Sequence, residues 1–314
     1  MKGLRTIPVM LDIARDMETY CPDAVMLNYT NPMAMIMWAI HQVTSISAVG
    51  LCHSVQGTSK QLSNYMQVDY ERMRYRTAGI NHMAWFLDLS LSGEDLYPRL
   101  KDCLNNPEIF KKDPVRFEIF KHFGYFVTES SRHMAEYIPY VMPHVEEMER
   151  LDQPLRTGEA FAKQNETRQS RIERAVEESK SASLELQKSN EYAATIIHAI
   201  ETDTPTYIYG NVCNTGLITN LLDRCCVEVP CLVNRVGVQG CYVGDLPLQC
   251  ASLCQSNVGM QGLTVQAILE QKREYVYHSA MVDPNTASQL TLPQIRTVID
   301  QLIEAQKELM PLLG

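Results

Sequence analysis

The sequence predicts an α/β protein in which part of a doubly wound sheet is followed by a mixed α+β region. Two observations support this prediction. Over the first 80 residues, stretches with helical spacing of apolar residues alternate with short apolar runs. These runs are bounded by turn-forming residues, as in a parallel sheet covered by helices. Beyond residue 80, alternating strand-like runs mix with long helical stretches. We therefore expect two domains, residues 1–80 and residues 81–314.

The composition is typical of a soluble globular protein and excludes several classes. The 314 residues suffice for two domains or one large α/β unit, and 45% are hydrophobic. A net charge of -9 without a basic stripe argues against a nucleic-acid partner. No apolar stretch reaches the roughly 20 residues of a membrane span. Ten cysteines without zinc-site spacing, and no secretory signal, favour the cytoplasm with most thiols buried and free.

The first 91 residues alternate between helices and strands. Leu4, Ile7 and Leu11 recur at helical spacing and predict an amphipathic first helix. Asn31-Pro32 begins the second helix, because proline costs least in the first turn. The predicted helices are 3–20, 32–43 and 56–66, and the predicted strands are 24–29, 46–52, 72–78 and 85–91.

The remaining residues predict a less regular arrangement. Residues 95–145 are helical and rich in turns, and residues 146–190 are dense in charge, which indicates exposed helices. Further predicted elements are a helix at 191–200, strands at 206–212 and 227–233, a long helix at 247–280, a break at 283–285 and a last helix at 292–309.

Polar residues capable of binding ligands follow three of the early apolar runs. Asn31 comes after the first run, Cys52-His53 after the second and Asn81-His82 after the third. Ligands of α/β sheets bind beyond the carboxyl ends of the strands, so we expect these residues to share one crevice. A single buried cysteine or histidine more often serves packing alone. Three such clusters in one stretch favour a functional site.

A fourth group lies further along the chain. Ser130-Ser131 has the chemistry of a helix N-cap, and one helical face would then carry Glu129, His133 and Tyr137. A solvated polar stripe is the simpler alternative for this spacing.

Five short motifs, taken together, resemble one enzyme family. They are Asn28-Tyr-Thr-Asn-Pro-Met-Ala34, Gly50-Leu-Cys-His-Ser54, Gly79-Ile-Asn-His-Met83, Val227-Glu-Val-Pro-Cys231 and Gly244-Asp-Leu-Pro247. Their order and spacing resemble glycoside hydrolase family 4 over essentially the whole chain, and within it the bacterial α-galactosidases. This family is the NAD-dependent exception among glycosidases.

The resemblance implies hydrolysis of α-galactosides such as melibiose with NAD and a divalent metal, usually Mn²⁺. In the family, NAD⁺ oxidises the sugar at C3, a base removes the C2 proton, the glycosidic oxygen leaves, water adds and the hydride returns. Residues 1–80 would then be the remainder of a Rossmann-like NAD-binding domain. Residues 81–314 would form the catalytic and oligomerisation domain, and we expect a homo-oligomer.

The resemblance also assigns roles to residues. Cys52 and His82 match the family's two metal ligands, although thiolates usually prefer softer metals than Mn²⁺. His53 matches a position that helps to protonate the departing oxygen. The other assignments are sugar contacts by Asn31 and Asn81, and a C2 base that is Tyr137 or, as weaker candidates, Tyr140 or Tyr192.

The sequence departs from the family in its N-terminal part. Relatives begin with a glycine-rich turn that holds the dinucleotide, and no G-x-G-x-x-G motif occurs here. We therefore expect that about the first 130 residues of a full-length relative are missing. NAD binding would be weakened, and an apolar sheet edge would be open to aggregation. No NAD-binding residue can be named.

Five alternatives stay open at this point. The substrate could be an α-glucuronide, an α-galacturonide or an α-glucoside, and Arg132 would suit a uronate. The chain could be an inactive fragment. It could also be an ordinary nicotinamide dehydrogenase, which would accumulate NADH.

Overall fold

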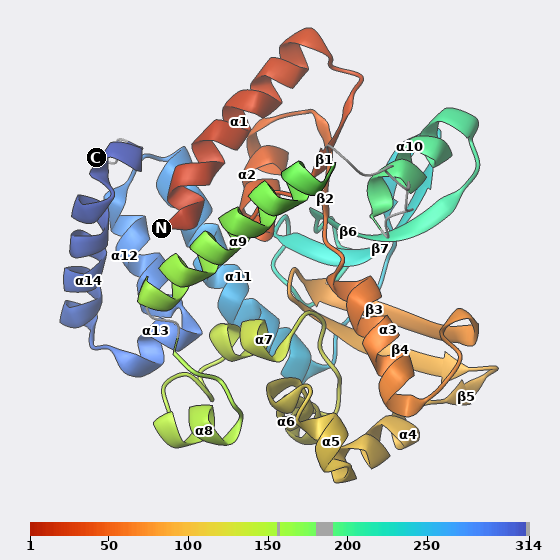
Figure 1. Ribbon diagram of the computed structural model, residues 1–314. Coiled ribbons are helices and arrows are strands. Elements are labelled where there is room, and N and C mark those ends of the chain that lie inside the picture. The colour runs from red at the N-terminus through yellow and green to blue at the C-terminus, as the bar shows by residue number, and fades with distance from the viewer. Residues whose placement is uncertain (156–157, 180–190, 312–314) are drawn as a thin grey trace.

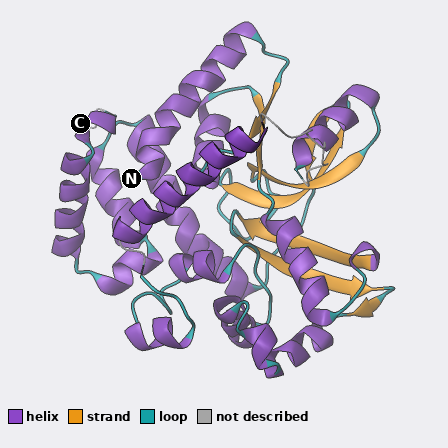
Figure 2. Ribbon diagram, in the orientation of Figure 1, coloured by secondary structure: helices purple, strands orange, loops and turns teal. Residues whose placement is uncertain are grey.

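The computed structural model describes residues 1–155, 158–179 and 191–311. Within these ranges, eight strands form one mixed sheet in the order β1-β2-β6-β7-β3-β4-β5, with β8 paired to β7. Helices surround the sheet, and both termini lie on the same side of the molecule (Figures 1 and 2). The predicted α/β fold class is therefore confirmed.

The strands are β1 (Val25–Asn28), β2 (Ser47–Leu51), β3 (Met73–Ile80), β4 (Met83–Leu91), β5 (Glu94–Asp95), β6 (Thr206–Cys213), β7 (Cys226–Asn234) and β8 (Gly237–Gly240). The helices are α1 (Lys2–Tyr20), α2 (Met33–Val43), α3 (Ser54–Met66), α4 (Tyr97–Asp102), α5 (Pro107–Phe110), α6 (Pro114–Phe123), α7 (Ser131–Tyr137), α8 (Val145–Arg150), α9 (Gly158–Ser179), α10 (Tyr192–Thr202), α11 (Leu248–Leu269), α12 (Arg273–Val282), α13 (Pro284–Gln289) and α14 (Leu292–Ala305). Short 3-10 helices lie at Tyr70–Arg72, Cys103–Asn105 and Lys307–Leu309.

The sheet is parallel only at one end. β1 pairs with β2 in parallel, and every other described pairing is antiparallel. Strands β6 and β7, from late in the chain, lie between β2 and β3. The sheet thus joins strands from both sides of residue 80, and the division into two domains there stays a prediction.

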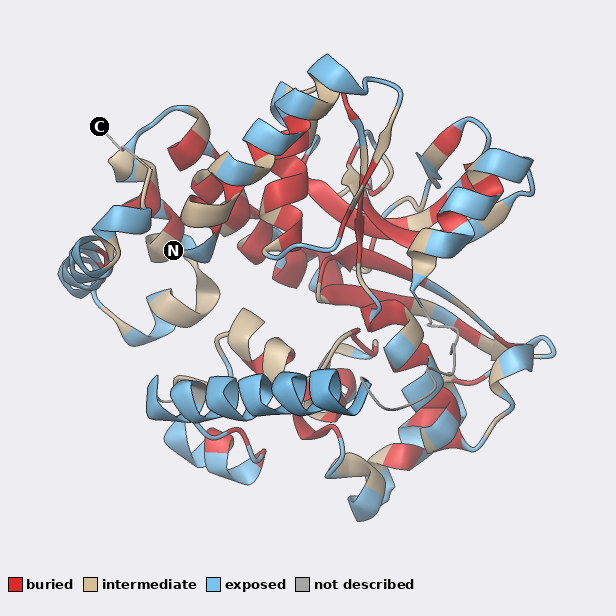
Figure 3. Cartoon of the chain, turned by 45° about the horizontal axis from the view of Figure 1, so that its top comes forward, coloured by how far each residue is buried: buried red, intermediate tan, exposed pale blue. Residues whose placement is uncertain are grey.

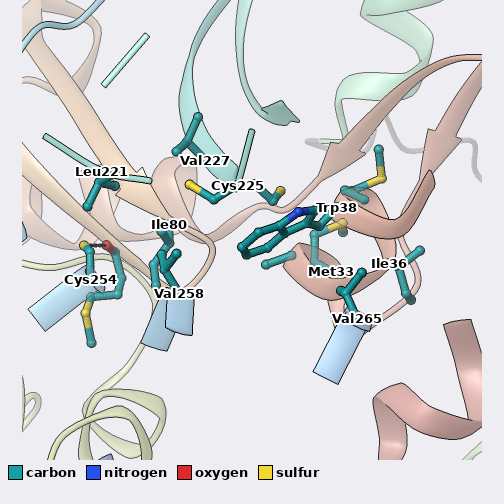
Figure 4. Packing of buried hydrophobic residues seen from close by; sticks show 14 of the residues in the cluster. Met33, Ile36, Trp38, Ile80, Leu221, Cys225, Val227, Cys254, Val258 and Val265 are labelled. Carbon is teal, nitrogen blue, oxygen red and sulfur yellow. Dashed lines mark hydrogen bonds between the residues drawn. The ribbon is translucent and has the colours of Figure 1, made fainter. Parts of the chain in front are cut away.

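The main core lies between the sheet and helices α1, α2 and α11. The apolar face of α1, with Leu4, Ile7 and Leu11, is buried as its spacing predicts. Helices α2 and α11 pack closely, because a Cβ atom at Gly262 would lie only 2.8 Å from the Trp38 ring. Figure 4 shows Trp38 in this core with side chains of α2, α11 and the sheet. A second apolar cluster, built on Phe86, Phe117 and Phe126, lies beside β4.

Two predicted helices differ from the structure, whereas the predicted break at 283–285 is confirmed. The expected helix at 247–280 is two helices, α11 and α12, separated by a turn in which Gln271 has a left-handed φ of 55°. Asp283 does end α12, but it also begins α13 by accepting a hydrogen bond from the N–H of Thr286 at 2.7 Å. The last helix ends at Ala305 rather than at residue 309.

The charge-dense segment and the cysteines follow the predictions where they are described. The residues of α9 whose burial is described are all exposed (Figure 3), whereas residues 180–190 lie outside the described ranges. All ten cysteines are described and are free thiols, and six of them are buried. None of the described helices has the length and apolar character to cross a membrane.

Candidate active site

The sheet brings Cys52 and His82 together through strands from the far end of the chain. One row of the sheet runs from Gly50 of β2 through Asn211 of β6 and Glu228 of β7 to Gly79 of β3. Cys52 follows β2 directly. His82 lies in the tight turn that joins β3 to the next strand, β4. β3 itself runs antiparallel to β7. All three clusters thus follow strands, as expected, but β3 is antiparallel to its neighbours whereas β1 and β2 are parallel.

His82 presents a neutral imidazole. It has a left-handed backbone, with φ of 64°, in the β3–β4 turn. Its ring centroid lies 4.8 Å from that of His133 and 6.3 Å from that of Tyr137. Burial lowers the pKa of His82 to about 4, although the nearby Glu129 opposes this shift. One of its two ring nitrogens is therefore unprotonated at neutral pH and has the lone pair that a metal ligand needs.

Cys52 is a largely buried thiol among polar atoms that have few partners. Burial, followed by the nearby Glu228 carboxyl, raises the pKa of Cys52 to about 11. Ser54 and Asn81 lie close enough to oppose this rise. Yet Ser54 Oγ and Asn81 Nδ2 are buried, and neither atom has a hydrogen-bond partner within bonding distance and angle among the described residues. The site therefore has unused capacity to bind a polar ligand.

Glu228 is a buried carboxyl that the sequence analysis missed as a site residue. Burial raises its pKa to about 8, against a weaker opposing hydrogen bond from Asn211. Asn211 Nδ2 lies 3.5 Å from Glu228 Oε1, and Oε2 has no partner among the described residues. An acidic residue within the apolar run Val227–Cys231 was the available signal, because buried acids are rare without a specific role.

Glu129 and His133 form an ion pair beside His82. Glu129 Oε2 lies 2.7 Å from His133 Nδ1, and the Glu129 side chain is only 23% exposed. Burial alone would raise the pKa of Glu129, but hydrogen bonds from His133 and Ser130 outweigh it and lower the pKa to about 2. Ser130 is the N-cap of α7, as predicted. These residues are partly buried in the site, so the solvated stripe is the wrong alternative.

Tyr137 completes this group. It lies at the end of α7, and burial raises its pKa above the ordinary value. The charges of Glu129 and, more weakly, Cys52 and Glu228 act in the same direction, which puts these groups near its hydroxyl. We call the following seven residues the strand-end cluster: Cys52, Asn81, His82, Glu129, His133, Tyr137 and Glu228.

The other predicted site residues lie around this cluster or away from it. Asn31 is exposed before α2, and its side-chain oxygen accepts a hydrogen bond from the N–H of Met33 at 3.1 Å. His53 is exposed, with Nδ1 3.5 Å from an oxygen of Glu191. Tyr140 is 47% exposed and packs against Phe123 instead.

Tyr192, the third candidate base, is mostly buried beside the cluster. Burial raises its pKa, the nearby Tyr75 and Glu228 add to the rise, and a hydrogen bond from Gln56 opposes it. Tyr192 therefore lies near Glu228, but on α10 rather than on α7, the helix that carries Tyr137.

The residues of the cluster fit a divalent metal in part. Within residues 1–155, 158–179 and 191–311, no three His, Cys, Asp or Glu side chains are grouped to hold a metal ion. If Cys52 and His82 are the protein ligands, oxygen atoms of water or substrate would have to complete the coordination. A dinucleotide fits less well. The carboxyl ends of the parallel pair β1 and β2 lie beside the cluster, but the sequence has no glycine-rich turn for the phosphates.

Two family models match the chain. The family 4 glycosyl hydrolase model matches residues 1–68, and the model of the family 4 glycosyl hydrolase C-terminal domain matches residues 77–286. The chain belongs to family 4 of the glycosyl hydrolases. The resemblance drawn from the five motifs is therefore confirmed, and the chain is a member of an enzyme family, that of the family 4 glycosidases.

Relatives of this family 4 chain include two proteins named α-galactosidase. The one from Bacillus subtilis (strain 168) is 42% identical and aligns with 99% of this chain and 72% of its own length. The one from Rhizobium meliloti (strain 1021) is 32% identical and aligns with 98% of this chain and 65% of its own length. The chain thus spans about two thirds to three quarters of these relatives.

Solved structures share the fold. A 6-phospho-α-glucosidase from gut microorganisms, in complex with NAD and Mn²⁺, is 21% identical with a TM-score of 0.80, over 99% of this chain and 73% of that one. A 6-phospho-β-glucosidase from Thermotoga maritima, with manganese, NAD⁺ and glucose-6-phosphate, is 19% identical with a TM-score of 0.76, over 98% and 72% of the two chains. At these identities the likeness establishes the fold alone.

Proposed function

We propose that this protein hydrolyses α-galactosides, such as melibiose, with NAD⁺ and Mn²⁺. One observation carries the proposal: Cys52, His82 and Tyr137 converge beside buried polar atoms that lack partners among the described residues. Two relatives at 42% and 32% identity bear the name α-galactosidase, which supports the choice of sugar.

In this proposal, Cys52 and His82 hold the metal ion. The burial that keeps the His82 imidazole neutral prepares it for this role. The high pKa of the Cys52 thiol means that metal binding releases its proton. When bound, NAD⁺ would take up and return the hydride at C3 of the sugar, and Mn²⁺ would draw electron density from the C2 and C3 oxygens.

The remaining residues would bind the sugar and move protons. Tyr137 removes the C2 proton, and because it lies beside His82, a cation held there would lower its raised pKa. Asn81, whose buried Nδ2 lacks a partner among the described residues, donates to a sugar hydroxyl. His53, which directly follows Cys52 in the chain, protonates the departing oxygen. Asn31, whose side-chain oxygen accepts from the N–H of Met33, contributes an amide nitrogen at the same edge of the sheet.

A uronide is the second candidate substrate. A relative from Lachnoclostridium phytofermentans, 27% identical, is named α-galacturonidase. However, the guanidinium of Arg132 lies 3.0 Å from Glu136 and also donates to the carbonyl of Pro154. Because this charge is already balanced within the protein, Arg132 does not favour a uronate over a neutral galactoside.

The test is hydrolysis of an aryl α-galactoside under reducing conditions, with and without NAD⁺ and Mn²⁺. We expect release that requires both additives and leaves no net NADH, which also separates this activity from that of a dehydrogenase. Cys52→Ser should abolish the activity, because the metal loses a ligand. Cys21→Ser, at an exposed thiol, should leave the activity unchanged. Release without either additive would contradict the proposal, and no release from the wild-type chain would favour the inactive alternative.

Three further features of the proposal rest on the sequence alone. They are the cytoplasmic location, the homo-oligomer and the assignment of residues 1–80 and 81–314 to NAD-binding and catalytic domains. Each stays a prediction.

A further inference from the structure

A large pocket beside α3 begins next to the strand-end cluster. Its volume is about 800 Å³, within the range of small-molecule sites. It is lined by His53, Gln56, Gly57, Lys60, Tyr70, Glu71, Glu191, Tyr192, Thr195 and Tyr207. Because His53 directly follows Cys52, this pocket begins one residue from the proposed metal ligand.

The pocket also reaches the cluster through Tyr192. The Tyr192 hydroxyl interacts with the Gln56 side chain, and the charge of Glu228 acts on it. His53 in turn is near enough to His82 to influence its charge. Tyr192 and His53 therefore connect the pocket lining with the strand-end cluster.

The lining has the chemistry that binds a neutral sugar. Tyr70, Tyr192 and Tyr207 supply aromatic rings with polar edges, against which the C–H face of a pyranose packs. Polar side chains lie between these rings. Among them, the buried Oε1 atom of Gln56 has no hydrogen-bond partner among the described residues and can accept from a hydroxyl.

Gly57 leaves open space along the pocket. It lies inside α3, where glycine is less favourable than alanine because it has more conformational freedom to lose. A Cβ atom at Gly57 would meet nothing within 4 Å, so packing within the protein does not require a glycine there. Since Gly57 lines the pocket, the missing side chain leaves room for a ligand.

We propose that this pocket is the leaving-group subsite, which holds the glucose unit of melibiose while its galactose unit lies in the strand-end cluster. The inference rests on the proposed α-galactosidase function and adds where the second sugar binds. It also predicts a preference: α-galactosides with a sugar leaving group should be better substrates than those with a methyl group.

The test compares two substrates in variants of the full chain supplied with NAD⁺ and Mn²⁺. For each variant we would measure the ratio of kcat/KM for melibiose to kcat/KM for methyl α-galactoside. Gly57→Leu should lower this ratio by about ten-fold or more, mainly through KM for melibiose, because the added side chain fills the pocket. Inhibition by free glucose should weaken in the same variant.

Gly259 provides the matched control. It also lies inside a helix, α11, and a Cβ atom there would likewise meet nothing within 4 Å. Gly57→Ala and Gly259→Ala should both raise the melting temperature, since alanine favours the helix. Only substitution of Gly57 should change the substrate ratio, and Gly259→Leu should leave it as it is.

The outcomes separate the two proposals. Hydrolysis of both substrates with an unchanged ratio in Gly57→Leu would overturn the subsite and leave the α-galactosidase function standing. Hydrolysis of neither substrate by the wild-type chain would overturn the function and the subsite with it. A fall in the ratio for Gly259→Leu equal to that for Gly57→Leu would mean that the effect is not local, which also contradicts the subsite.

Discussion

Two buried polar clusters differ in how completely their polar atoms are paired. One is the strand-end cluster. The other, which we call the arginine cluster, is built around a buried ion pair and consists of Thr58, Gln61, Tyr65, Asp113, Arg116 and Ser131. Of the two, only the strand-end cluster has buried polar atoms without a hydrogen-bond partner among the described residues.

The arginine cluster is saturated. Arg116 is 1% exposed and donates to Asp113, to Thr58 at 3.0 Å and to Gln61 at 2.6 Å. Asp113 in turn accepts hydrogen bonds from Tyr65 at 2.8 Å and Ser131 at 3.0 Å. Such a network ties α3 to α6 and to the start of α7.

The strand-end cluster is not saturated. Ser54 Oγ beside it, Asn81 Nδ2 and Glu228 Oε2 are buried without partners among the described residues. A buried polar atom without a partner costs about 1–3 kcal/mol, so a fold selected for stability alone would pair it. The contrast indicates that the arginine cluster holds the fold and that the strand-end cluster is kept ready for a ligand.

The two clusters are also joined. Thr58 Oγ1, which accepts from Arg116, accepts a second hydrogen bond from the N–H of Glu129 at 3.1 Å. Ser131 binds Asp113 and lies in the first turn of α7, the helix that carries His133 and Tyr137. The saturated cluster therefore positions one side of the unsaturated one.

Loss of the proposed base should have the largest effect on activity. Tyr137→Phe should lower kcat for an aryl α-galactoside by about 10²–10⁴-fold, because the C2 proton loses its acceptor. Unfolding in urea should change little, since the ring is kept. Tyr140→Phe is the matched control and should behave as the wild type, because Tyr140 is exposed and packs against Phe123. The opposite pattern would make Tyr140 the base.

Disruption of the arginine cluster should have the largest effect on stability. Arg116→Met leaves Asp113 buried without its cation and should cost about 3–5 kcal/mol of unfolding free energy. The Arg76–Asp88 ion pair is the control, because its side chains are 46% and 61% exposed. Arg76→Met should cost about 0–1 kcal/mol in the same urea titration. Equal costs for the two substitutions would remove the distinction between the clusters.

Glu228 should make the metal-free protein less stable as pH rises. The pKa of Glu228 is raised from an ordinary 4.5 to about 8, so between these values the folded state holds a proton that the unfolded state has lost. This group should therefore lower stability by up to about 1.4 kcal/mol per pH unit between pH 4.5 and 8. In Glu228→Gln the contribution should vanish, as urea titrations with a chelator across this range would measure. Parallel pH curves for the two proteins would contradict the assignment.

Removal of the α7 cap should have the smallest effect. Ser130 Oγ accepts a hydrogen bond from the N–H of His133 at 3.3 Å. Ser130→Ala should cost about 1 kcal/mol of stability, the usual value for an N-cap. The cap residue Thr291 of α14 is a comparison outside both clusters. Ser130→Ala should also lower activity, because Ser130 contacts Glu129, whereas Thr291→Ala should cost as much stability and spare activity. Equal activity in the two variants would contradict this.

The sequence predicted the local structure well where the pattern was local. The spacing of Leu4, Ile7 and Leu11 predicted α1, and Ser130-Ser131 predicted the cap of α7. The break at Gln271 was not predictable, because a left-handed glutamine leaves the apolar pattern on either side unchanged.

The candidate site was predicted only in part, because it depends on pairing between distant strands. Cys52 and His82 could be named from motifs in one stretch of 31 residues, from 52 to 82. Glu228 lies beside them only because β6 and β7 insert between β2 and β3. No short-range pattern encodes that insertion, so the position of the Glu228 carboxyl beside Cys52 appeared only in the structure.

The central claim is that Cys52 and His82 bind a divalent metal, and a Mn²⁺ titration tests it most directly. Free Mn²⁺ would be measured by electron paramagnetic resonance in the presence of methyl α-galactoside and without NAD⁺, so that no turnover occurs. We predict one tight site in the wild type, weakened by more than about ten-fold in Cys52→Ser and in His82→Ala and unchanged in Cys21→Ser. Equally tight binding in the wild type and in Cys52→Ser would contradict the account.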